Sequence, residues 1–565
     1  MRKKDVPEKI RDIAVEALKE YFAEHLPDIA FPHGIKIQVQ PAKDKLHGDI
    51  STNAAMQAAS FAKRSPREIA GYLLKSIERK IGGSDIADQI SKVEEKGGFI
   101  NIFLSEAYFM GVLAGINSLK SDYGKSRAGN GIKVNLEFVS ANPTGPLTIA
   151  HGRQAAIGDA LGRILRFNGY DVTQEYYLND CGRQINMLGR SLYVRYLGLL
   201  GVSADMPEDG YIGDYVIKEA LVIKQAEGDR YLADTPENAV FFRDRAVAFI
   251  MEMIYKDLED FRVRFDVWTS QGKIEKEGRV AEAISELERK GHVFRDGGAV
   301  WFRSTAFGDD KDRVLIKSDG SYTYLAPDIA YHKDKYSRGF DKLIDLLGPD
   351  HHGYIPRMKA AAEALGRNKD SLDILIVQLV TLMRGGVAVS MSTRKAEFVS
   401  LREIIDEIGT DVARFFFLVR RLDSHLDFDI ELAKKESDDN PVYYIQYAHA
   451  RICSIVRYNN EKGEGALASD GSDLSLLVHD SEKSLMRKLS DFPSVVASSA
   501  QALEPNRVVT YLGELAREFH SFYTNCRVVS DNTELSRARL FLVECVRIVL
   551  SNGLGLLNIS LPEKM

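Results

Sequence analysis

The sequence predicts an α/β protein built around a parallel sheet, with further domains before and after it. The stretch 134–177 opens with the β-branched and aromatic run VNLEFV, which is typical of a buried strand. Apolar residues then recur three and four positions apart across 155–165, which indicates an amphipathic helix, and DVTQEYY predicts another strand. Strand, loop, helix and strand form a parallel βαβ unit, so we expect a Rossmann-like core. With 565 residues the chain exceeds the ~250–300 residues of a single core, and three or four domains are expected.

The loop after the first strand carries the polar residues of this unit. Its Asn142, Pro143 and Gly145 disfavour both a helix and a central strand. It lies at the carboxyl end of the strand, where open parallel sheets bind ligands, and N–H groups at the helix start can hold an anion. His151 and Arg153 follow, and Arg153 is expected to add fixed positive charge there. Taken alone, His151 is more simply explained as a helix-capping residue.

Residues 1–120 are predicted to form a separate small α+β domain. A helix is expected at 5–24, an alternating extended segment at 34–40, two helices joined by a turn within 47–74, and a closing strand at 97–105. This pattern by itself indicates only an accessory domain.

The α/β core is predicted to span 121–410, with an insertion at about 180–300. The apolar positions of 241–268 suit packed helices rather than strands. Alternation of strands and helices returns in 313–365, where KLIDLLG is a short buried strand followed by a helix. Further on, a strand, a hairpin turn at Gly385-Gly386 and a helix beginning at Ser400 are expected.

The remainder of the chain is predicted to be helical. Residues 411–440 form a linking segment, and 441–565 read as amphipathic helices of a bundle. No apolar run approaches the ~18 residues of a membrane span, and the charged N-terminus is unlike a signal peptide.

Charge and cysteine usage exclude several classes of protein. The net charge of −6 argues against nonspecific nucleic-acid binding by bulk charge. The four cysteines are isolated in sequence, with no CxxC pair, so neither a zinc ribbon nor a disulfide framework is supported. A cytoplasmic location is expected, because a reducing compartment suits such cysteines.

The segment EFVSANPTGPLTIAHGR, residues 137–153, resembles the signature region of class I aminoacyl-tRNA synthetases. More narrowly, it resembles that of bacterial arginyl-tRNA synthetases, where the loop has the form ANPTGPLHVGHGR. Thr148 replaces the first histidine of the family motif, and Ala150 replaces its glycine. The resemblance implies catalytic roles for His151 and Thr148. It also implies that Ser140 and His151 contact the substrates and that ATP is bound by Pro143, Gly145, Thr148, Ala150 and His151.

A second segment supplies polar residues for the opposite wall of the site. Tyr324 and Asp328 are four apart, which on a helical turn places phenol and carboxylate on one face. A guanidinium is planar and always charged, and carboxylates hold it best in a fork. The segment YTYLAPDIAYHKDKY resembles the arginine-binding region of the family, although Asp328 alone would be read as a surface ion-pair partner. The implied arginine-binding set is Glu137, Ser140, Asn142, His151, Tyr324 and Asp328.

The segment GPDHH resembles the GxDHH loop of the same family. By this resemblance Gly348 permits close approach of ATP, Asp350 binds the ribose hydroxyls, and His352 completes the site. A zinc site on His351 and His352 is the competing idea. Adjacent histidines point in different directions and no third ligand stands at metal spacing, so no protein-bound metal is expected.

The segment SMSTRK, residues 390–395, resembles the flexible class I motif KMSKS, whose lysines stabilise the leaving pyrophosphate. Both motif lysines are missing. Arg394 and Lys395, displaced by one or two positions, are expected to supply the catalytic charge, and Met391 and Ser392 to contact ATP.

The C-terminal run from DVARFFF to NPVYYIQYAHARI resembles the anticodon-binding bundle of arginyl-tRNA synthetases, and GDISTNAAM resembles their tRNA-contacting N-terminal domain. Single-stranded RNA is read by stacking and by base edges. Tyr444, Tyr523 and Met565 are therefore expected to contact tRNA, and the alternative is that each belongs to the core.

These resemblances together imply an arginine–tRNA ligase. It would convert L-arginine and ATP to arginyl-adenylate, with Mg²⁺ held through the phosphates, and transfer arginine to the 3′ end of tRNA(Arg). A monomer without a membrane partner is expected. Two alternatives remain open: a tRNA-binding paralogue that has lost adenylation, and a nucleotidyltransferase on the same core that does not use tRNA.

Overall fold

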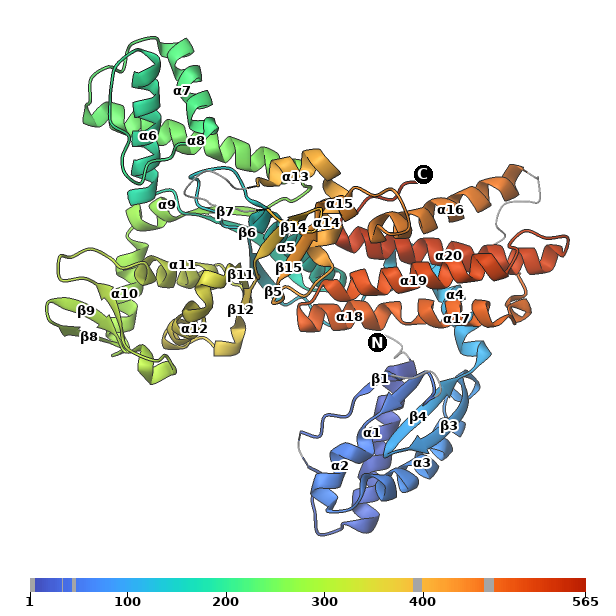
Figure 1. Ribbon diagram of the computed structural model, residues 1–565. Coiled ribbons are helices and arrows are strands. Elements are labelled where there is room, and N and C mark those ends of the chain that lie inside the picture. The colour runs from blue at the N-terminus through green and yellow to red at the C-terminus, as the bar shows by residue number, and fades with distance from the viewer. Residues whose placement is uncertain (1–5, 33, 43–46, 390–398, 462–471) are drawn as a thin grey trace.

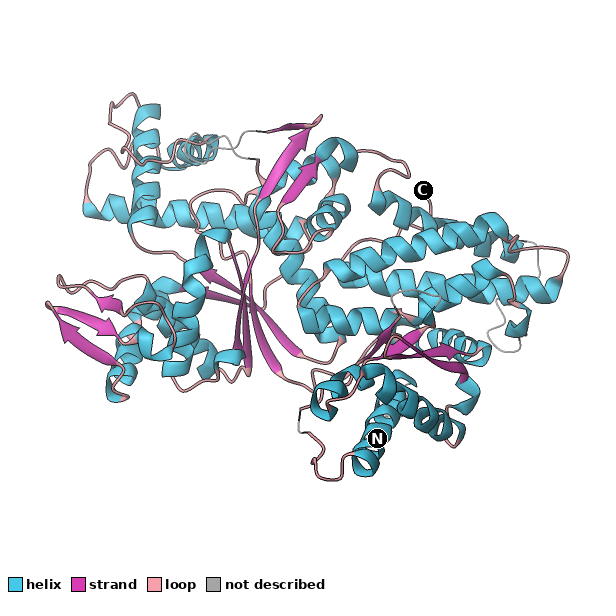
Figure 2. Cartoon of the chain, turned by 60° about the horizontal axis from the view of Figure 1, so that its bottom comes forward, coloured by secondary structure: helices cyan, strands magenta, loops and turns pink. Residues whose placement is uncertain are grey.

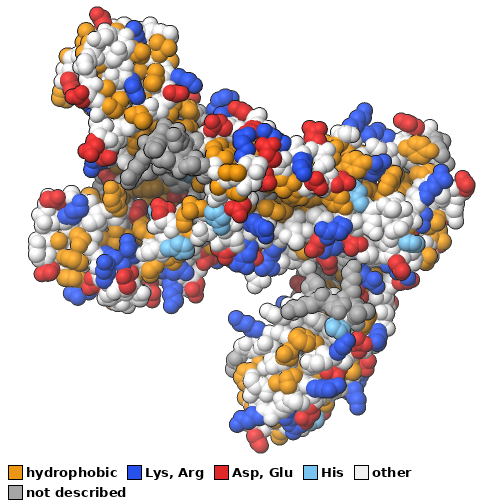
Figure 3. Space-filling view, viewed as in Figure 1, with side chains coloured by type: hydrophobic (Ala, Val, Ile, Leu, Met, Phe, Trp, Pro, Cys, Tyr) orange, Lys and Arg blue, Asp and Glu red, His pale blue; other side chains and the backbone are white. Residues whose placement is uncertain are grey.

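The protein has a central α/β body, a helical lobe that projects from it, an N-terminal domain and a C-terminal helix bundle (Figures 1 and 2). The computed structural model describes residues 6–32, 34–42, 47–389, 399–461 and 472–565. Basic and acidic side chains are interspersed over the face drawn in Figure 3, in agreement with the small net charge.

The core is a five-stranded parallel sheet with the order β12-β11-β5-β6-β7. Its strands are β5 (Lys133–Glu137), β6 (Asp171–Leu178), β7 (Val267–Ser270), β11 (Lys342–Leu347) and β12 (Leu372–Ile376). Helix α5 (Ile149–Phe167) connects β5 to β6, which confirms the predicted βαβ unit. Because β5 and β11 are parallel neighbours, the loops that follow them lie at the same edge of the sheet.

Helix α5 approaches the end of β5 closely at Gly158. A methyl group at this position would overlap the ring of Phe138, a side chain that is fully buried. Core side chains have no free space into which to move, so an added carbon atom at such a site strains the packing.

We expect Gly158→Ala to lower the free energy of unfolding by about 1–3 kcal/mol, measured by urea denaturation, because the core is overpacked. Gly111→Ala is the matched control. Gly111 is also helical, but nothing lies near its added methyl group, so alanine should be neutral or stabilising by up to ~1 kcal/mol. Equal denaturation midpoints for Gly158→Ala and the wild type would contradict this account of the packing.

The insertion is not purely helical, so the prediction for 180–300 was partly wrong. Helices α6 (Arg183–Leu199), α7 (Asp214–Glu227) and α8 (Pro236–Asp260) pack together as expected and form the projecting lobe (Figure 1). However, β7 joins the parallel sheet beside β6. After α9 (Gln271–Lys276) and α10 (Arg279–Arg289), strands β8 (Val293–Asp296), β9 (Ala299–Phe302) and β10 (Arg313–Ile316) form an antiparallel sheet. A strand of four residues is too short to leave a periodic pattern that can be recognised in the sequence.

The second half of the core follows the prediction over 313–410, but the linking segment 411–440, which was predicted to be helical, also contains a strand at 426–429, because four residues carry too little pattern. Helix α11 (Leu325–Ser337) precedes β11, and the 3₁₀ segment η5 (Pro349–Tyr354) and α12 (Ile355–Ala364) follow it. Strands β13 (Val380–Arg384) and β14 (Val387–Ala388) form the expected hairpin, and β13 also pairs with β15 (Leu426–Asp429). Ser400 caps α13 (Leu401–Ile408), as predicted, and α14 (Thr410–Leu418) and the short α15 (Ile430–Ala433) complete this part.

The N-terminal domain is α+β, but two of its strands were not predicted. The helices α1 (Val6–His25), α2 (Ala54–Ala62) and α3 (Pro66–Gly82) were expected. They cover an antiparallel sheet of β1 (Val39–Pro41), β2 (Ile50–Thr52), β4 (Phe99–Leu104) and β3 (Ile90–Lys96). The extended segment predicted at 34–40 contributes only the short β1. Helix α4 (Glu106–Leu119) leads from this domain to the core.

The C-terminal bundle consists of α16 (Pro441–Glu461), α17 (Asp480–Ser490), α18 (Phe492–Ala502), α19 (Asn506–Asn525) and α20 (Thr533–Leu557). Helix α20 is long and apolar enough to cross a membrane by length and composition, which the sequence analysis overlooked. In the fold, 72% of its most apolar window is buried, and it packs against α4, α5, α16 and α19. Its apolar character therefore serves the core of the bundle.

Candidate active site

The loop after β5 holds a strained backbone. Val139 and Ser140 have φ angles of 66° and 39°, in the left-handed region that side chains other than glycine rarely adopt. This turn places the Ser140 hydroxyl so that it donates to Oε1 of Glu137 at 2.9 Å and accepts the N–H of Tyr177 at 3.0 Å. Such strain costs of order 1–3 kcal/mol per residue and clusters at functional sites. Here it fixes the orientation of the buried Glu137 carboxylate.

His151 caps α5, as the simpler explanation proposed. The backbone N–H of Thr148 donates to Nδ1 of His151 at 3.1 Å. Burial lowers the pKa of His151 to about 4, so its ring is neutral at pH 7. With Nδ1 acting as the acceptor, Nε2 carries the proton and remains a donor for a ligand. The capping role and a role in binding phosphate oxygens are therefore compatible.

Arg153 does not add positive charge at the N-terminus of α5, so this prediction was wrong. Its guanidinium is fully buried and donates to the carbonyl oxygens of Gln378, Arg421 and Ser424 at 2.8–2.9 Å. Position 153 lies on the face of α5 that packs toward β13 and the loop before β15. Arg153 therefore ties these loops to α5 and has a structural role.

The four candidate residues of the degenerate motif, Met391, Ser392, Arg394 and Lys395, lie outside the described residues. The chain that follows the motif is docked on the signature loop. The Ile149 N–H donates to the Val399 oxygen at 3.1 Å, and the Leu401 N–H donates to the Leu147 oxygen at 2.7 Å. Residues 399–401 are thus joined to the signature loop by two backbone hydrogen bonds.

Asp328 lies at the start of α11 and faces Glu137. Its carboxylate accepts a hydrogen bond from the Tyr354 hydroxyl, which comes from η5 at the end of β11. Burial raises the pKa of Asp328 to about 6, and the negative charge of Glu137 adds to this effect. The carboxylates of Glu137 and Asp328 come from distant parts of the chain and are close enough for their negative charges to interact, an arrangement suited to a cationic ligand.

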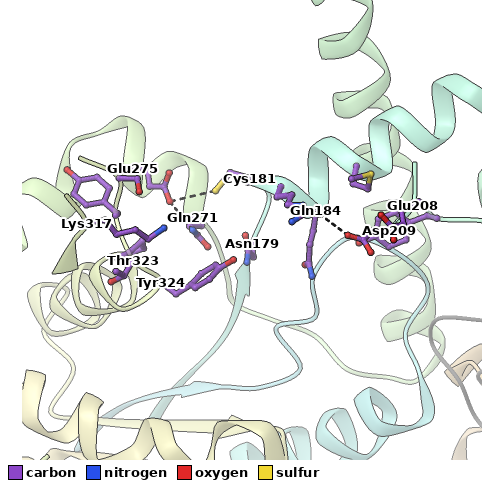
Figure 4. A pocket seen from close by; sticks show the side chains of 18 of the residues that line it. Asn179, Cys181, Gln184, Glu208, Asp209, Gln271, Glu275, Lys317, Thr323 and Tyr324 are labelled. Atoms are coloured by element: carbon purple, nitrogen blue, oxygen red, sulfur yellow. Dashed lines mark hydrogen bonds and ion pairs between the residues drawn. The ribbon is translucent and has the colours of Figure 1, made fainter. Parts of the chain in front are cut away.

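Tyr324 precedes α11 and has 86% of its surface exposed. Its phenol lines a cleft of about 1180 Å³ between the β6–α6 loop and the start of α11 (Figure 4). It extends across this space toward Asn179, whereas Asp328 is partly buried and is not one of the lining residues. Tyr324 and Asp328 are thus one helical turn apart, as predicted, but only Tyr324 is exposed in the cleft.

Asn142 reaches the same cleft through Gln184. Its amide donates to Oε1 of Gln184 at 3.0 Å, and Gln184 is one of the lining residues. Of the predicted arginine-binding residues, Tyr324 lines the cleft and Asn142 contacts a lining residue, whereas Glu137 and Asp328 are not among the residues that line it. Sequence reasoning missed Gln184 and Tyr354, and the proximity of Tyr354 to the GPDHH motif was the available signal.

The GPDHH segment forms η5 at the carboxyl end of β11, beside the signature loop. Asp350, His351 and His352 are exposed, and Asp350 pairs with Nε2 of His351 at 3.4 Å. A methyl group at Gly348 would meet only the end of the exposed Asp350 side chain, so packing within the protein alone does not require a glycine here. Among the described residues no three metal-ligating side chains are grouped, so the zinc alternative gains no support.

The expected tRNA contacts lie on the bundle and at its end. The Tyr444 ring is half-buried and packs on His520 with a centroid distance of 4.4 Å. Tyr523 is 38% exposed, with the guanidinium of Arg451 above its ring at 5.2 Å. Met565 is exposed near Tyr443. Tyr523 and Met565 are thus accessible to a partner, and Tyr444 is shared between core and surface.

Family models match three successive parts of the chain. The "Arginyl tRNA synthetase N terminal domain" matches residues 16–104, "tRNA synthetases class I (R), catalytic domain" matches 115–416, and "DALR anticodon binding domain" matches 445–565. Arginine–tRNA ligase of Bacillus subtilis is 45% identical, with 99% of this chain and 100% of the relative covered. The chain belongs to the arginyl-tRNA synthetase family. Arginine–tRNA ligase 1 of Halalkalibacterium halodurans is 46% identical over 98% of this chain and 97% of its own.

Solved structures confirm the fold class of this synthetase. A putative arginyl-tRNA synthetase from Campylobacter jejuni superimposes with a TM-score of 0.75 at 34% identity, covering 82% of this chain and all of its own. The Thermus thermophilus arginyl-tRNA synthetase shares the fold, with a TM-score of 0.77 at 22% identity, over 99% of this chain and all of its own.

Proposed function

We propose that this synthetase activates L-arginine with ATP and transfers it to the 3′ end of tRNA(Arg), releasing AMP and pyrophosphate. The observation that carries the proposal is that the carboxylates of Glu137 and Asp328 interact through their negative charges, while Tyr324 and the Gln184 partner of Asn142 line a neighbouring cleft. A binding protein without catalysis has no need of this arrangement. The near full-length identity to arginine–tRNA ligases favours the ligase over both alternatives.

The guanidinium of arginine is placed between Asp328 and Glu137. Each carboxylate accepts N–H groups, and a desolvated, fixed pair of acceptors binds a planar cation more strongly than mobile ones do. Ser140 holds Glu137 in place, and Asn142 and Tyr324 contact the rest of the amino acid from the cleft.

ATP lies across the start of α5. Backbone N–H groups at this helix start and the Nε2–H of His151 face the phosphates, and Thr148, Ala150, Pro143 and Gly145 shape the loop around the nucleotide. Gly348, Asp350 and His352 hold the ribose. Mg²⁺ enters as part of the ATP substrate, bound by its phosphates. Met391 and Ser392 contact the nucleotide, and Arg394 and Lys395 supply charge to the leaving pyrophosphate.

The reaction needs positioning and charge stabilisation, with no covalent enzyme intermediate. The arginine carboxylate attacks the α-phosphorus of ATP and displaces pyrophosphate, and the ribose hydroxyl of the tRNA end then accepts the arginyl group from AMP. We assign tRNA contact to residues 1–120 and 441–565, on either side of a catalytic domain at 121–410 and a linking segment at 411–440. A monomeric, cytoplasmic enzyme completes the proposal.

Tyr523→Ala should raise the KM for tRNA(Arg) about fivefold to hundredfold or more, because stacking of one base on a tyrosine contributes about 1–3 kcal/mol. The KM values for arginine and ATP should stay unchanged. Tyr458→Ala, which removes another exposed tyrosine of the bundle, is the control. Equal aminoacylation kinetics of Tyr523→Ala and the wild type would remove Tyr523 from the tRNA site.

Pyrophosphate exchange with arginine, ATP and tRNA(Arg) tests the proposed function. Arginine-dependent exchange that requires tRNA, followed by formation of arginyl-tRNA, is expected. Exchange that tRNA does not affect would favour a nucleotidyltransferase. Binding of tRNA without exchange would favour a paralogue that has lost adenylation.

A further inference from the structure

A row of three buried carboxylates crosses the centre of the sheet beneath the proposed arginine site. Asp345 on β11, Glu137 on β5 and Glu175 on β6 are register partners, so their side chains emerge side by side from neighbouring strands. Their residues are only 2%, 5% and 0% exposed. Like charges placed this close in a buried site cannot all remain ionised without cations.

Helix α11 supplies the cations. Nζ of Lys335 lies 2.5 Å from Oε2 of Glu137 and 2.8 Å from Oδ1 of Asp345. Arg338, one turn later, forms hydrogen bonds of 2.8 and 2.9 Å with both oxygens of Glu175. Lys335 is fully buried and Arg338 is partly exposed. Lys335 and Asp328 are seven residues apart, so one face of α11 carries both a proposed arginine ligand and the cation behind it.

Lys335 controls the state of Glu137 because it bridges the carboxylates of Glu137 and Asp345. Burial works against its charge, yet Asp345 and Glu137 raise the pKa of Lys335 above its usual value, so it is a cation at neutral pH. Without it, Glu137 and Asp345 would share a proton, as paired buried carboxylates do. A protonated carboxyl group presents an O–H where the guanidinium needs an acceptor.

We propose that Lys335 is a positioning residue for arginine: it holds Glu137 as a carboxylate, with Oε2 fixed, for the guanidinium to bind. This inference rests on the proposed function. Lys335 touches neither substrate nor ATP in this account and acts through Glu137. The charged and titratable groups around Glu137 are Glu175 and Tyr177 from β6, Asp345 from β11, and Asp328, Tyr331, His332 and Lys335 from α11.

The test measures equilibrium binding of radiolabelled L-arginine to the full chain, so it does not depend on catalysis. Lys335→Met keeps the length of the side chain but removes its charge, and we expect arginine affinity to fall at least tenfold at pH 7. Affinity should recover as pH rises from about 7 to 9, because the shared proton is lost, whereas wild-type affinity stays nearly constant over this range. The dissociation constant for ATP should change less than twofold.

Arg338→Met is the matched control, because it removes the other cation of the row without touching Glu137. Its arginine affinity should stay within twofold of the wild type. The proposal is overturned if Lys335→Met binds arginine as tightly as the wild type. It is also overturned if both variants lose affinity equally, for arginine and for ATP. Neither result would contradict the proposed function. If the wild type itself does not bind arginine, the proposed function fails and the inference with it.

If circular dichroism shows that Lys335→Met does not fold, Lys335→Gln is used to test whether the charge of Lys335 is needed for arginine binding. Glutamine keeps N–H donors for the two carboxylates and lacks only the charge. Affinity for arginine at least threefold weaker than that of the wild type, with the same recovery at high pH, supports the role of the charge. Wild-type affinity without any dependence on pH refutes it.

Discussion

Replacement of Asp328 by alanine is expected to raise the KM for arginine about hundredfold or more, measured by tRNA-dependent pyrophosphate exchange. Loss of a buried, charged acceptor leaves the guanidinium with an unpaired side and costs several kcal/mol. The KM for ATP should change little, because Asp328 lies on α11 and the nucleotide is placed across the start of α5. Asp373→Ala, which removes a carboxylate of β12 that pairs with Lys342, is the control.

Titration of Asp328 is expected to make the KM for arginine depend on pH. Burial raises the pKa of Asp328 to about 6, so the carboxylate that binds arginine is present above this pH and is lost as pH falls through it. The KM for arginine should therefore rise below about pH 6 and be nearly constant above pH 7. Asp328→Ala should lose this dependence. A KM for arginine that is unchanged in Asp328→Ala would exclude the residue from the site.

Arg414→Met is expected to lower the free energy of unfolding by about 3–5 kcal/mol, measured by urea denaturation. Arg414 on α14 is fully buried and joins three other helices. It donates to Asp159 of α5 at 2.5 Å, to the Phe261 oxygen after α8 at 3.0 Å and to the Leu557 oxygen of α20 at 3.1 Å. The variant leaves a buried carboxylate and two carbonyl groups without this donor, so the catalytic core and the bundle lose their shared contact.

Arg163→Met provides the comparison, because Arg163 also pairs with Asp159, at 3.1 Å, but is 39% exposed. An exposed pair of this kind contributes about 0–1 kcal/mol. Equal denaturation midpoints for Arg414→Met and Arg163→Met would show that the buried Arg414 stabilises the contact between the catalytic core and the bundle no more than the exposed Arg163 does.

Local patterns predicted the βαβ unit and the helices because burial on one face leaves a periodic trace in the sequence. The strand at 342–347, the turn at Gly385-Gly386 and the capping role of Ser400 were all correct. The strands β2, β7 and β8 were missed because three or four residues carry too little pattern, and β3 was missed because its residues are mostly polar and none of them is buried. The long apolar helix α20 was not recognised as such, because scattered charges interrupt it.

The candidate site residues were predicted from the resemblance to a family and stay predictions, whereas the expected role of Arg153 was wrong because tertiary packing decides it. Nothing local distinguishes Arg153, which packs against two distant loops, from an arginine that faces a ligand. Likewise, the pairing of Lys335 with Glu137 depends on the register of three strands and on how α11 lies over them. A sequence does not display such long-range geometry.

The central claim is that one guanidinium lies between carboxylates from two distant halves of the chain. A crystal structure with L-arginine bound tests it most directly. We expect guanidinium nitrogens about 3 Å from carboxylate oxygens of both Asp328 and Glu137. Arginine bound elsewhere, or with its guanidinium directed away from these two side chains, would contradict the account.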